Sequence, residues 1–382
     1  MKKTRAGRPF RIAALLVGCL FALLADFLVR QAYLAVRPKK VAEPQTHRVR
    51  HSLYHHGIAP NSSATDHFGP YSAPYFSNSL GLRDESVREI PLVSSRARIL
   101  FIGDSFTEAG PIPWGQTFVG RVAAALQAKG VEVLNAGVAS YCPTLIKIKL
   151  RDLLVTQGLQ VDRVVVLIDI SDLKDELYYR ENSQGAAEQI PYGPFFEQAA
   201  RLGRIDRICD WLETHVEKNF VILGAVVRNV RLQWRKHGDR GGVTAYDEIP
   251  LWAYGWPDYQ GPYQNLVTEG LRRAQASMQG VAGLLREQGV ALTVVVYPWP
   301  QQIRARTQPS RVEKVWAEWS EKNKAQFITL FPIFVNTTPA EEIISQYYWK
   351  NDAHWNEEGH RLVAEALLRA DGGLFLPAKT SP

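Results

Sequence analysis

A serine follows directly after a short apolar run near residue 100. The run covers residues 99–102, and Gly103, Asp104 and Ser105 come next. An apolar run of this length that is closed by glycine indicates a buried strand of a parallel sheet. Open α/β sheets bind their ligands at the carboxyl ends of the strands, so Ser105 is a candidate nucleophile. Taken alone, the stretch is also compatible with a solvated serine in a turn.

A carboxylate and an imidazole stand close together near the other end of the chain. Asp352 and His354 are two residues apart, so they can share one side of an extended segment. A serine nucleophile needs an adjacent base, and the base needs a third group that fixes its tautomer. We therefore predict that His354 takes the proton of Ser105, that Asp352 holds His354, and that the reaction is acyl transfer from an ester.

Two further motifs lie between these ends, Leu-Asn-Ala-Gly-Val at residues 134–138 and the run 164–172, which closes with Asp-Ile-Ser-Asp. With Gly-Asp-Ser-Phe before them and Asp-Ala-His-Trp-Asn after them, the four blocks resemble those of the SGNH (GDSL) hydrolase superfamily in order and spacing. The resemblance implies a three-layer α/β/α, flavodoxin-like fold with a central parallel sheet.

The same resemblance implies an oxyanion hole. The backbone N–H groups of Ser105 and Gly137 would line it, and the hydroxyl of Ser171 would contribute where relatives have an asparagine amide. The third block has Asp169 and Ser171 in place of its usual Gly and Asn, and the Asp-to-His spacing is two where many members have three. Both departures resemble a membrane-associated branch that includes alginate and cell-wall O-acetylation proteins.

The elements that must position these residues alternate between strand and helix. We predict strands at residues 99–102, 131–135, 161–170, 291–297 and 327–330, and helices at 116–129, 144–157, 263–288 and from 356 onward. Such alternation predicts a parallel sheet with helices on both faces. The hydrolase-like domain is predicted at residues 96–372, with an insertion at 174–262 and a tail at 373–382.

The insertion carries four tryptophans, at 211, 234, 252 and 256, among many arginines. It has three interpretations: a glycan-clasping surface, a helical insertion with its own small core, or a patch that rests on a membrane.

Residues 1–36 begin with a basic tail and continue with an 18-residue run at 12–29 that is apolar except for Asp26. About 17–25 such residues cross a bilayer. No small-x-small site ends the run, so we predict an uncleaved signal anchor in the inner membrane, with a cytoplasmic tail and the catalytic domain in the periplasm. A cleaved signal peptide and a lipoprotein site at Cys19 are the alternatives.

Charge and cysteine content narrow the function further. The first 50 residues carry a charge of +9 and the remainder about −2, so the basic balance of the whole chain does not indicate a nucleic-acid partner. Cys142 and Cys209 could form a disulfide, although free buried thiols are favoured. No metal or cofactor is expected.

Residues 37–95 are predicted as a polar connector of loop and short strand. The pair His55-His56 is interpreted as a polar contact rather than a metal site. The turn at residues 78–84 could either shape the substrate cleft or be purely structural. Asp104 and Asp172 are expected to hold their loops.

The predicted function is that of a serine esterase or O-acyltransferase acting on ester-linked acyl groups, first of all acetyl groups, of an envelope glycan or other carbohydrate. Its partners would be an acylated carbohydrate or small ester, the inner membrane and polysaccharide-modification proteins. The alternative is a catalytically inactive envelope protein of the same fold that binds glycans or supports assembly.

Overall fold

The computed structural model describes residues 7–36, 47–190, 264–306 and 309–370, together with Phe220 and Leu223. The chain divides into two compact units, Met1–Glu43 with Phe196–Glu248, and Pro44–Phe195 with Ile249–Pro382. Cys209 and the four tryptophans of the predicted insertion lie outside the described residues.

The first unit contains one described helix, α1, which spans Gly7–Val36. Within this unit the carboxylate of Asp26 accepts a hydrogen bond from the backbone N–H of Leu223 at 2.9 Å. Among the residues that the structure describes, no helix combines the length and the apolar character of a membrane span. The anchor at residues 12–29 stays a prediction.

The second unit is built on an eight-stranded sheet in the order β12-β11-β8-β6-β7-β5-β4-β3. The strands are β3 Ser63–Phe68, β4 Tyr71–Ser77, β5 Arg83–Asp84, β6 Ala97–Ile102, β7 Val131–Asn135, β8 Arg163–Ile168, β11 Ala291–Val296 and β12 Gln326–Thr329. The five from β12 to β7 are parallel, whereas β5, β4 and β3 continue the sheet in antiparallel fashion. The expectation of an α/β fold with a mostly parallel central sheet is confirmed.

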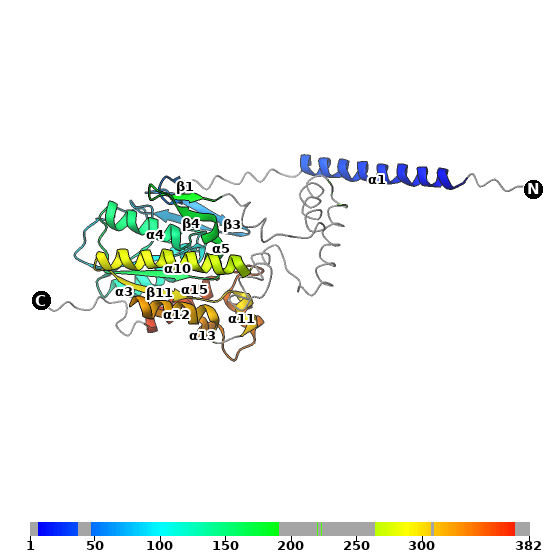
Figure 1. Ribbon diagram of the computed structural model, residues 1–382. Helices are drawn as coiled ribbons and strands as arrows, with labels where there is room; N and C mark the ends of the chain where they lie inside the picture. The colour runs from blue at the N-terminus through cyan, green and yellow to red at the C-terminus, as the bar shows by residue number, and fades with distance from the viewer. Residues whose placement is uncertain are drawn as a thin grey trace, which may run out of the picture. The chain divides into compact units, whose positions relative to one another are not determined.

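Helices cover both faces of this sheet. The longer ones are α3 Phe118–Gln127, α4 Pro143–Arg151, α10 Gln264–Glu287, α12 Arg311–Asn323, α14 Ala340–Tyr347 and α15 Glu357–Ala370, and the shorter ones are α2 Ser105–Glu108, α5 Asp172–Tyr178, α11 Pro300–Ala305 and α13 Phe331–Phe334. α10 packs beside α4 and α12, and α15 packs against α3 (Figure 1). The chain moves in opposite directions from β6 to β7 and from β7 to β8, so right-handed crossovers place α3 and α4 on opposite faces.

The central strands are mostly apolar, as expected where both faces of a sheet are covered. Residues 99–102 of β6 are all fully buried, as are Val164, Val165 and Val166 of β8. The helix predicted at 144–157 forms as α4 and ends in a π-helical turn, Asp152–Thr156.

The predicted connector differs from expectation, because it contributes three strands to the central sheet and the separate hairpin of β1 Arg48–His51 and β2 His55–Ile58. In β4, Ala73, Tyr75 and Ser77 are buried while Ser72 and Pro74 are exposed. This alternation extends over only a few residues and is mixed with polar side chains. It is therefore a weak sequence signal for a strand, although the pairing with β3 and β5 is complete.

Arg83 of β5 connects this added part of the sheet to the segment after the predicted nucleophile. Its side chain is 1% exposed and donates hydrogen bonds to the backbone carbonyls of Glu108, Ala109 and Ile112. A helix end or loop that is buried needs such partners, because its carbonyls are otherwise unsatisfied. Arg83 thus supplies three of these partners with one side chain.

Replacing Arg83 with methionine should lower the free energy of unfolding by about 3 kcal/mol or more, because several buried carbonyls lose their donor together. Urea denaturation followed by circular dichroism would measure the change. Arg180→Met is the matched control, since Arg180 forms an exposed ion pair with Glu188 at 3.0 Å and should contribute little. Equal stabilities of the two variants would contradict this role for Arg83.

Candidate active site

The structure brings Ser105, His354 and Asp352 together. Ser105 Oγ lies 2.7 Å from His354 Nε2, and His354 Nδ1 lies 2.5 Å from Asp352 Oδ1. The imidazole side chain is 24% exposed and the carboxylate 10%. A nucleophile, a base and an orienting carboxylate are therefore connected in one chain of hydrogen bonds, and the base is open to solvent or substrate.

Asp352 and His354 lie in a tight turn and not in the extended segment that their spacing suggested. The turn is closed by Trp349, whose N–H donates to the carbonyl of His354 at 3.0 Å and whose carbonyl accepts from the N–H of Asp352 at 3.2 Å. Asn351 takes a positive φ of 60° within it. Asp352 Oδ1 also accepts from the backbone N–H of His354 at 2.8 Å, so one oxygen fixes both the turn and the ring.

The motif residues that follow His354 attach this turn to the core. Trp355 is fully buried and contacts the rings of Phe106 and Tyr297, each with a centroid distance of 4.8 Å. Asn356 caps α15 by accepting from the N–H of Gly359 at 2.9 Å, and it donates to the carbonyl of Gln346 at 2.9 Å. The tryptophan and the asparagine thus determine where the histidine stands.

Ser105 is the first residue of α2, directly after the carboxyl end of β6. Asp104 caps the helix by accepting from the N–H of Phe106 at 3.0 Å. A Cβ at Gly103 would lie 2.4 Å from Thr107 Oγ1 and 3.2 Å from the carbonyl oxygen of Leu167. The glycine is therefore required by the close approach of β8 and α2 at this point.

The ionisation of Asp352 determines the direction of proton transfer. Burial raises the pKa of this carboxyl, but the hydrogen bond and charge of His354 outweigh burial and hold the pKa below its ordinary value. The ionised carboxylate can only accept, so it takes the Nδ1–H and leaves the Nε2 lone pair facing Ser105. This is the tautomer that a general base requires.

A group of buried acids lies behind the nucleophile. Burial, followed by the charge of Asp169, raises the pKa of both Asp104 and Asp172 well above the ordinary range. Asp104 Oδ1 accepts from Tyr297 at 3.0 Å, and Asp172 Oδ2 accepts from the N–H of Asp169 at 2.7 Å. Both acids hold their loops, as predicted.

The three predicted oxyanion donors differ in their hydrogen-bond partners. The N–H of Ser105 lies in the first turn of α2, where no intrahelical acceptor exists. The N–H of Gly137 donates to Asn135 Oδ1 at 2.9 Å, and Ser171 Oγ donates to Asp169 Oδ1 at 2.7 Å. The N–H of Gly137 and the hydroxyl of Ser171 would therefore have to exchange these partners for an oxyanion, so their predicted roles stay predictions.

The loop that carries Gly137 is fastened to the nucleophile helix. The side chain of Asn135 donates to the carbonyl of Thr107 at 2.8 Å, and the carboxylate of Glu108 accepts from the N–H of Ala139 at 2.6 Å. A Cβ at Gly137 would lie 2.7 Å from the N of Glu108, so only glycine allows this approach. These contacts fasten the two loops to each other.

Glu108 belongs to a buried charge cluster that could suggest a metal. In the described part of the chain, one set of ligand-type side chains, His47, Asp66 and Glu108, has its atoms within 4.8 Å of one another. Arg48 Nη2 lies 2.7 Å from Glu108 Oε1 and 3.2 Å from Asp66 Oδ2. A guanidinium that already stands between the carboxylates takes the place of a cation, so the cluster acts as a structural ion pair.

The histidine pair makes polar contacts, and a side-chain hydrogen bond closes the turn at residues 78–84. His55 Nδ1 lies 2.9 Å from His56 Nδ1, and His56 Nε2 lies 2.8 Å from the carbonyl of Ala139. Asn78 Oδ1 accepts from the N–H of Leu80 at 3.1 Å, which closes the turn at residues 78–84. Cys142 is a free, buried thiol.

Lys149 is a buried cation that the sequence analysis missed. Its Nζ donates to the carbonyl of Ala136 at 3.1 Å and lies 5.5 Å from the ring centroid of Tyr54 and 5.1 Å from that of Tyr141. Burial lowers the pKa of Lys149 to about 7, although Glu108 and Asp152 act against this shift. The available signal was its place in α4, four residues after the buried Leu145 and therefore on the apolar face.

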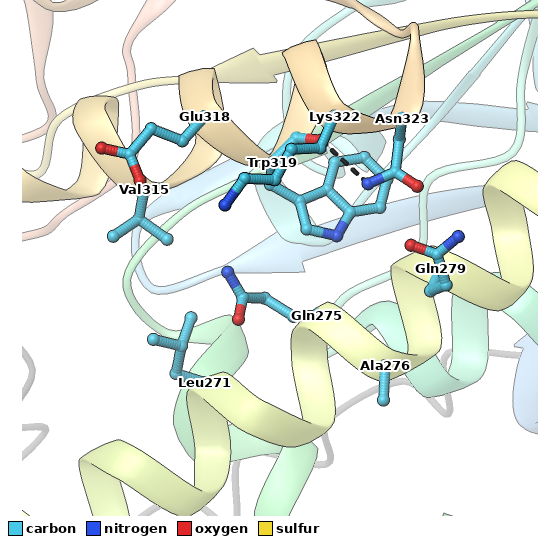
Figure 2. Close-up of a pocket in the computed structure, with 9 residues that line it drawn as sticks. All are labelled: Leu271, Gln275, Ala276, Gln279, Val315, Glu318, Trp319, Lys322 and Asn323. Carbon is cyan, nitrogen blue, oxygen red and sulfur yellow. Dashed lines mark hydrogen bonds between the residues drawn. The ribbon is translucent and has the colours of Figure 1, made fainter.

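A cavity of about 570 Å³ lies away from this triad, between α10 and α12. In Figure 2, Gln275 and Leu271 of α10 face Trp319 of α12 across it. None of the residues that line the cavity belongs to the triad.

Comparison with known proteins agrees with the resemblance. Residues 260–371 match the family model described as the SGNH hydrolase-like domain of the acetyltransferase AlgX. The matched segment contains Asp352 and His354 but not Ser105. It confirms the predicted resemblance to the SGNH hydrolase superfamily. No curated protein is significantly similar to the chain in sequence.

Similar solved structures include an acetylxylan esterase from Geobacillus stearothermophilus, with 15% identity and a TM-score of 0.36, covering 74% of this chain and 97% of that one. Another is a G-D-S-L family protein from Desulfitobacterium hafniense DCB-2, with 10% identity and a TM-score of 0.37, covering 72% of this chain and 98% of that one.

The lowered pKa of Lys149 predicts a pH dependence of stability. Between about pH 7 and the ordinary lysine pKa of about 10.4, the unfolded chain binds more protons at this site than the native protein. The free energy of unfolding should therefore rise with pH in this window, whereas below pH 7 the full cost of burying the charge remains.

Relative to Lys149→Met, the wild type should gain on the order of 2 kcal/mol between pH 7 and 9. Urea denaturation at several pH values measures the difference, with the exposed Lys129→Met as control. Parallel pH curves for wild type and Lys149→Met would contradict the assignment.

Proposed function

We propose that this chain is a serine esterase or O-acyltransferase that acts on acyl groups of a carbohydrate, with acetyl as the favoured acyl group. Residues 260–371 are similar to an SGNH hydrolase-like acetyltransferase domain. The observation that carries the proposal is the hydrogen-bonded series from Ser105 through His354 to Asp352, at 2.7 and 2.5 Å. The matched family is described as an acetyltransferase, which supports acetyl as the acyl group.

In the first half of the proposed reaction, Ser105 Oγ attacks the ester carbonyl carbon while its proton moves to His354 Nε2. The carbonyl oxygen becomes an oxyanion, which the N–H of Ser105 is placed to meet. When the tetrahedral intermediate collapses, the bond between the carbonyl carbon and the alcohol oxygen breaks. The alcohol leaves with the proton from His354, and the acyl group stays on Ser105.

In the second half, an acceptor attacks the acyl-serine and gives its proton to His354 Nε2. The bond to Ser105 Oγ then breaks, and the serine recovers the proton. Water as acceptor makes the protein an esterase, whereas a sugar hydroxyl makes it an O-acyltransferase. The ionised Asp352 stabilises the imidazolium that forms in each half without taking its proton.

The proposal includes a place in the cell envelope, which rests on the sequence of residues 1–36. Five basic residues precede the apolar run at 12–29, and a long domain follows it. A short basic N-terminus stays in the cytoplasm, so the domain with the triad would face the periplasm, where envelope glycans and their modifying proteins lie.

Ser105→Ala and His354→Ala should each reduce turnover of 4-nitrophenyl acetate to about the same residual rate as the double variant. When catalytic residues act as one unit, removing any one of them lowers the rate about as much as removing all, typically by about 10⁴–10⁶-fold. Asp352→Asn should reduce kcat less strongly, because Asp352 acts on the imidazole and not on the ester.

The control is Ser320→Ala, which changes a buried serine of α12 outside the triad. A phosphonate that labels active serines should modify Ser105 in the wild type and fail with His354→Ala. If the wild type neither hydrolyses esters nor takes the label, the inactive binding-protein alternative replaces the enzyme.

A periplasmic reporter fused after Pro382 should be active in cells, because the charge pattern of residues 1–36 predicts a C-terminus outside the cytoplasm. Two separate fusions at this position give opposite readouts: alkaline phosphatase is active only in the periplasm, and a cytoplasm-specific fluorescent protein is active only in the cytoplasm. Activity of only the cytoplasmic reporter would reverse the proposed topology.

A further inference from the structure

Three aromatic rings form a continuous wall beside the candidate base. The ring centroid of Phe68 lies 5.7 Å from that of His354, and Trp349 lies 6.4 Å from the same imidazole. Tyr71 stacks on Trp349 at 4.4 Å with an interplanar angle of 10°. Phe68, Tyr71 and Trp349 are called the aromatic wall below.

The wall combines two segments that are far apart in sequence. Phe68 ends β3 and Tyr71 begins β4, so they pair across the hairpin turn at residues 69–70. Gly69 at this turn has a φ of 58°, a conformation that favours glycine. Trp349 follows α14 and closes the turn of Asp352 and His354. The hairpin therefore reaches the triad from the outer edge of the sheet.

The wall is covered only in part. Trp349 is 8% exposed, because Tyr71 lies on its face, whereas Phe68 and Tyr71 are half-buried. His67, Lys350 and Asn351 lie within two residues of Phe68 or Trp349 in the sequence and are exposed, so they supply polar groups near the wall. An aromatic surface with polar groups at its border, adjacent to reacting groups, has the composition of a small-molecule binding site.

The position of the aromatic wall beside His354 indicates which part of a substrate could bind to it. An ester that reacts with Ser105 must place its carbonyl near His354 Nε2, which lies 2.7 Å from Ser105 Oγ. The rest of the substrate then extends over the rings that flank the imidazole. A pyranose fits both parts of this surface, since its C–H face is apolar and can stack on a ring while its hydroxyl groups reach the polar border.

We propose that the aromatic wall is the subsite that binds the pyranose ring carrying the ester. This inference rests on the proposed function and names the residues that bind the sugar of the glycosyl ester. Phe68 and Tyr71 present their rings to the sugar, and Trp349 holds Tyr71 in place. The β3–β4 hairpin, which lies before the nucleophile in sequence, thereby selects the substrate.

The test compares two kinds of ester in the purified full-length protein. For each variant, kcat/KM is measured on acetylated xylotriose and on 4-nitrophenyl acetate, and the ratio of the two values is formed. In Phe68→Leu and Tyr71→Leu, which keep an apolar side chain but remove the ring, the ratio should fall severalfold. In the double variant it should fall about tenfold, mainly through KM on the sugar. Phe76→Leu, a half-buried aromatic further along β4, should leave the ratio unchanged.

A second measurement separates this subsite from catalysis. Ser105→Ala should bind acetylated xylotriose, as followed by tryptophan fluorescence, and adding Phe68→Leu and Tyr71→Leu should weaken this binding by about tenfold. If the wild type hydrolyses no ester but the binding still depends on the wall, the enzyme proposal fails and the subsite stands.

Three other outcomes would overturn the subsite. Equal losses on both esters would mean that the rings only position His354. An unchanged ratio together with unchanged binding would mean that the sugar does not touch them. A selective loss on 4-nitrophenyl hexanoate relative to the acetate would mean that the wall accepts an acyl chain instead.

Discussion

The hydrogen bond between Ser105 Oγ and His354 Nε2 joins residues that are 249 positions apart, and most of the second unit serves to make it. A bond of 2.7 Å tolerates only small movements of either loop. The parallel strands bring the two segments to the same region, because their carboxyl ends share one edge of the sheet. The fine adjustment comes from caps and packing, in which Asp104 fixes the start of α2 and Trp355 fixes the histidine turn.

Buried charge supports this site on the side away from the substrate. Arg83 satisfies the carbonyls after α2, and Arg48 neutralises Glu108, which in turn holds the loop of Gly137 through Ala139. Lys149 also holds this loop, through a hydrogen bond to the carbonyl of Ala136. Burying a charged group without a partner destabilises the folded state, and the partners of these groups offset that unfavourable free energy. Such a network makes the loops around the nucleophile rigid and interdependent.

The side that faces the substrate is built differently. It is formed by aromatic rings of a hairpin tip and of the histidine turn, which contact one another. A rigid catalytic centre and a separate recognition surface can change independently. Under the proposed function, the four short motifs indicate the reaction chemistry, whereas the substrate preference would depend on rings that lie outside these motifs.

The sequence by itself determined the core of the fold and singled out the residues of the candidate triad. Ser105, Asp352 and His354 stood out because each follows or precedes a strong periodic signal, and the apolar runs of β6, β7, β8, β11 and β12 were long enough to predict a parallel sheet. Local caps, such as those of Asp104 and Asp172, were also predictable because they act within two or three residues.

Only the tertiary structure decided the rest. The strands β3, β4 and β5 are short and partly polar, so their place in the sheet depends on pairing with neighbours and not on their own pattern. The partners of Gly137 and Ser171, the burial of Arg83 and Lys149, and the approach of Phe68 to His354 all arise between distant segments. Such contacts leave no periodic signal in the sequence, because their energy depends on the position of both partners in the folded protein.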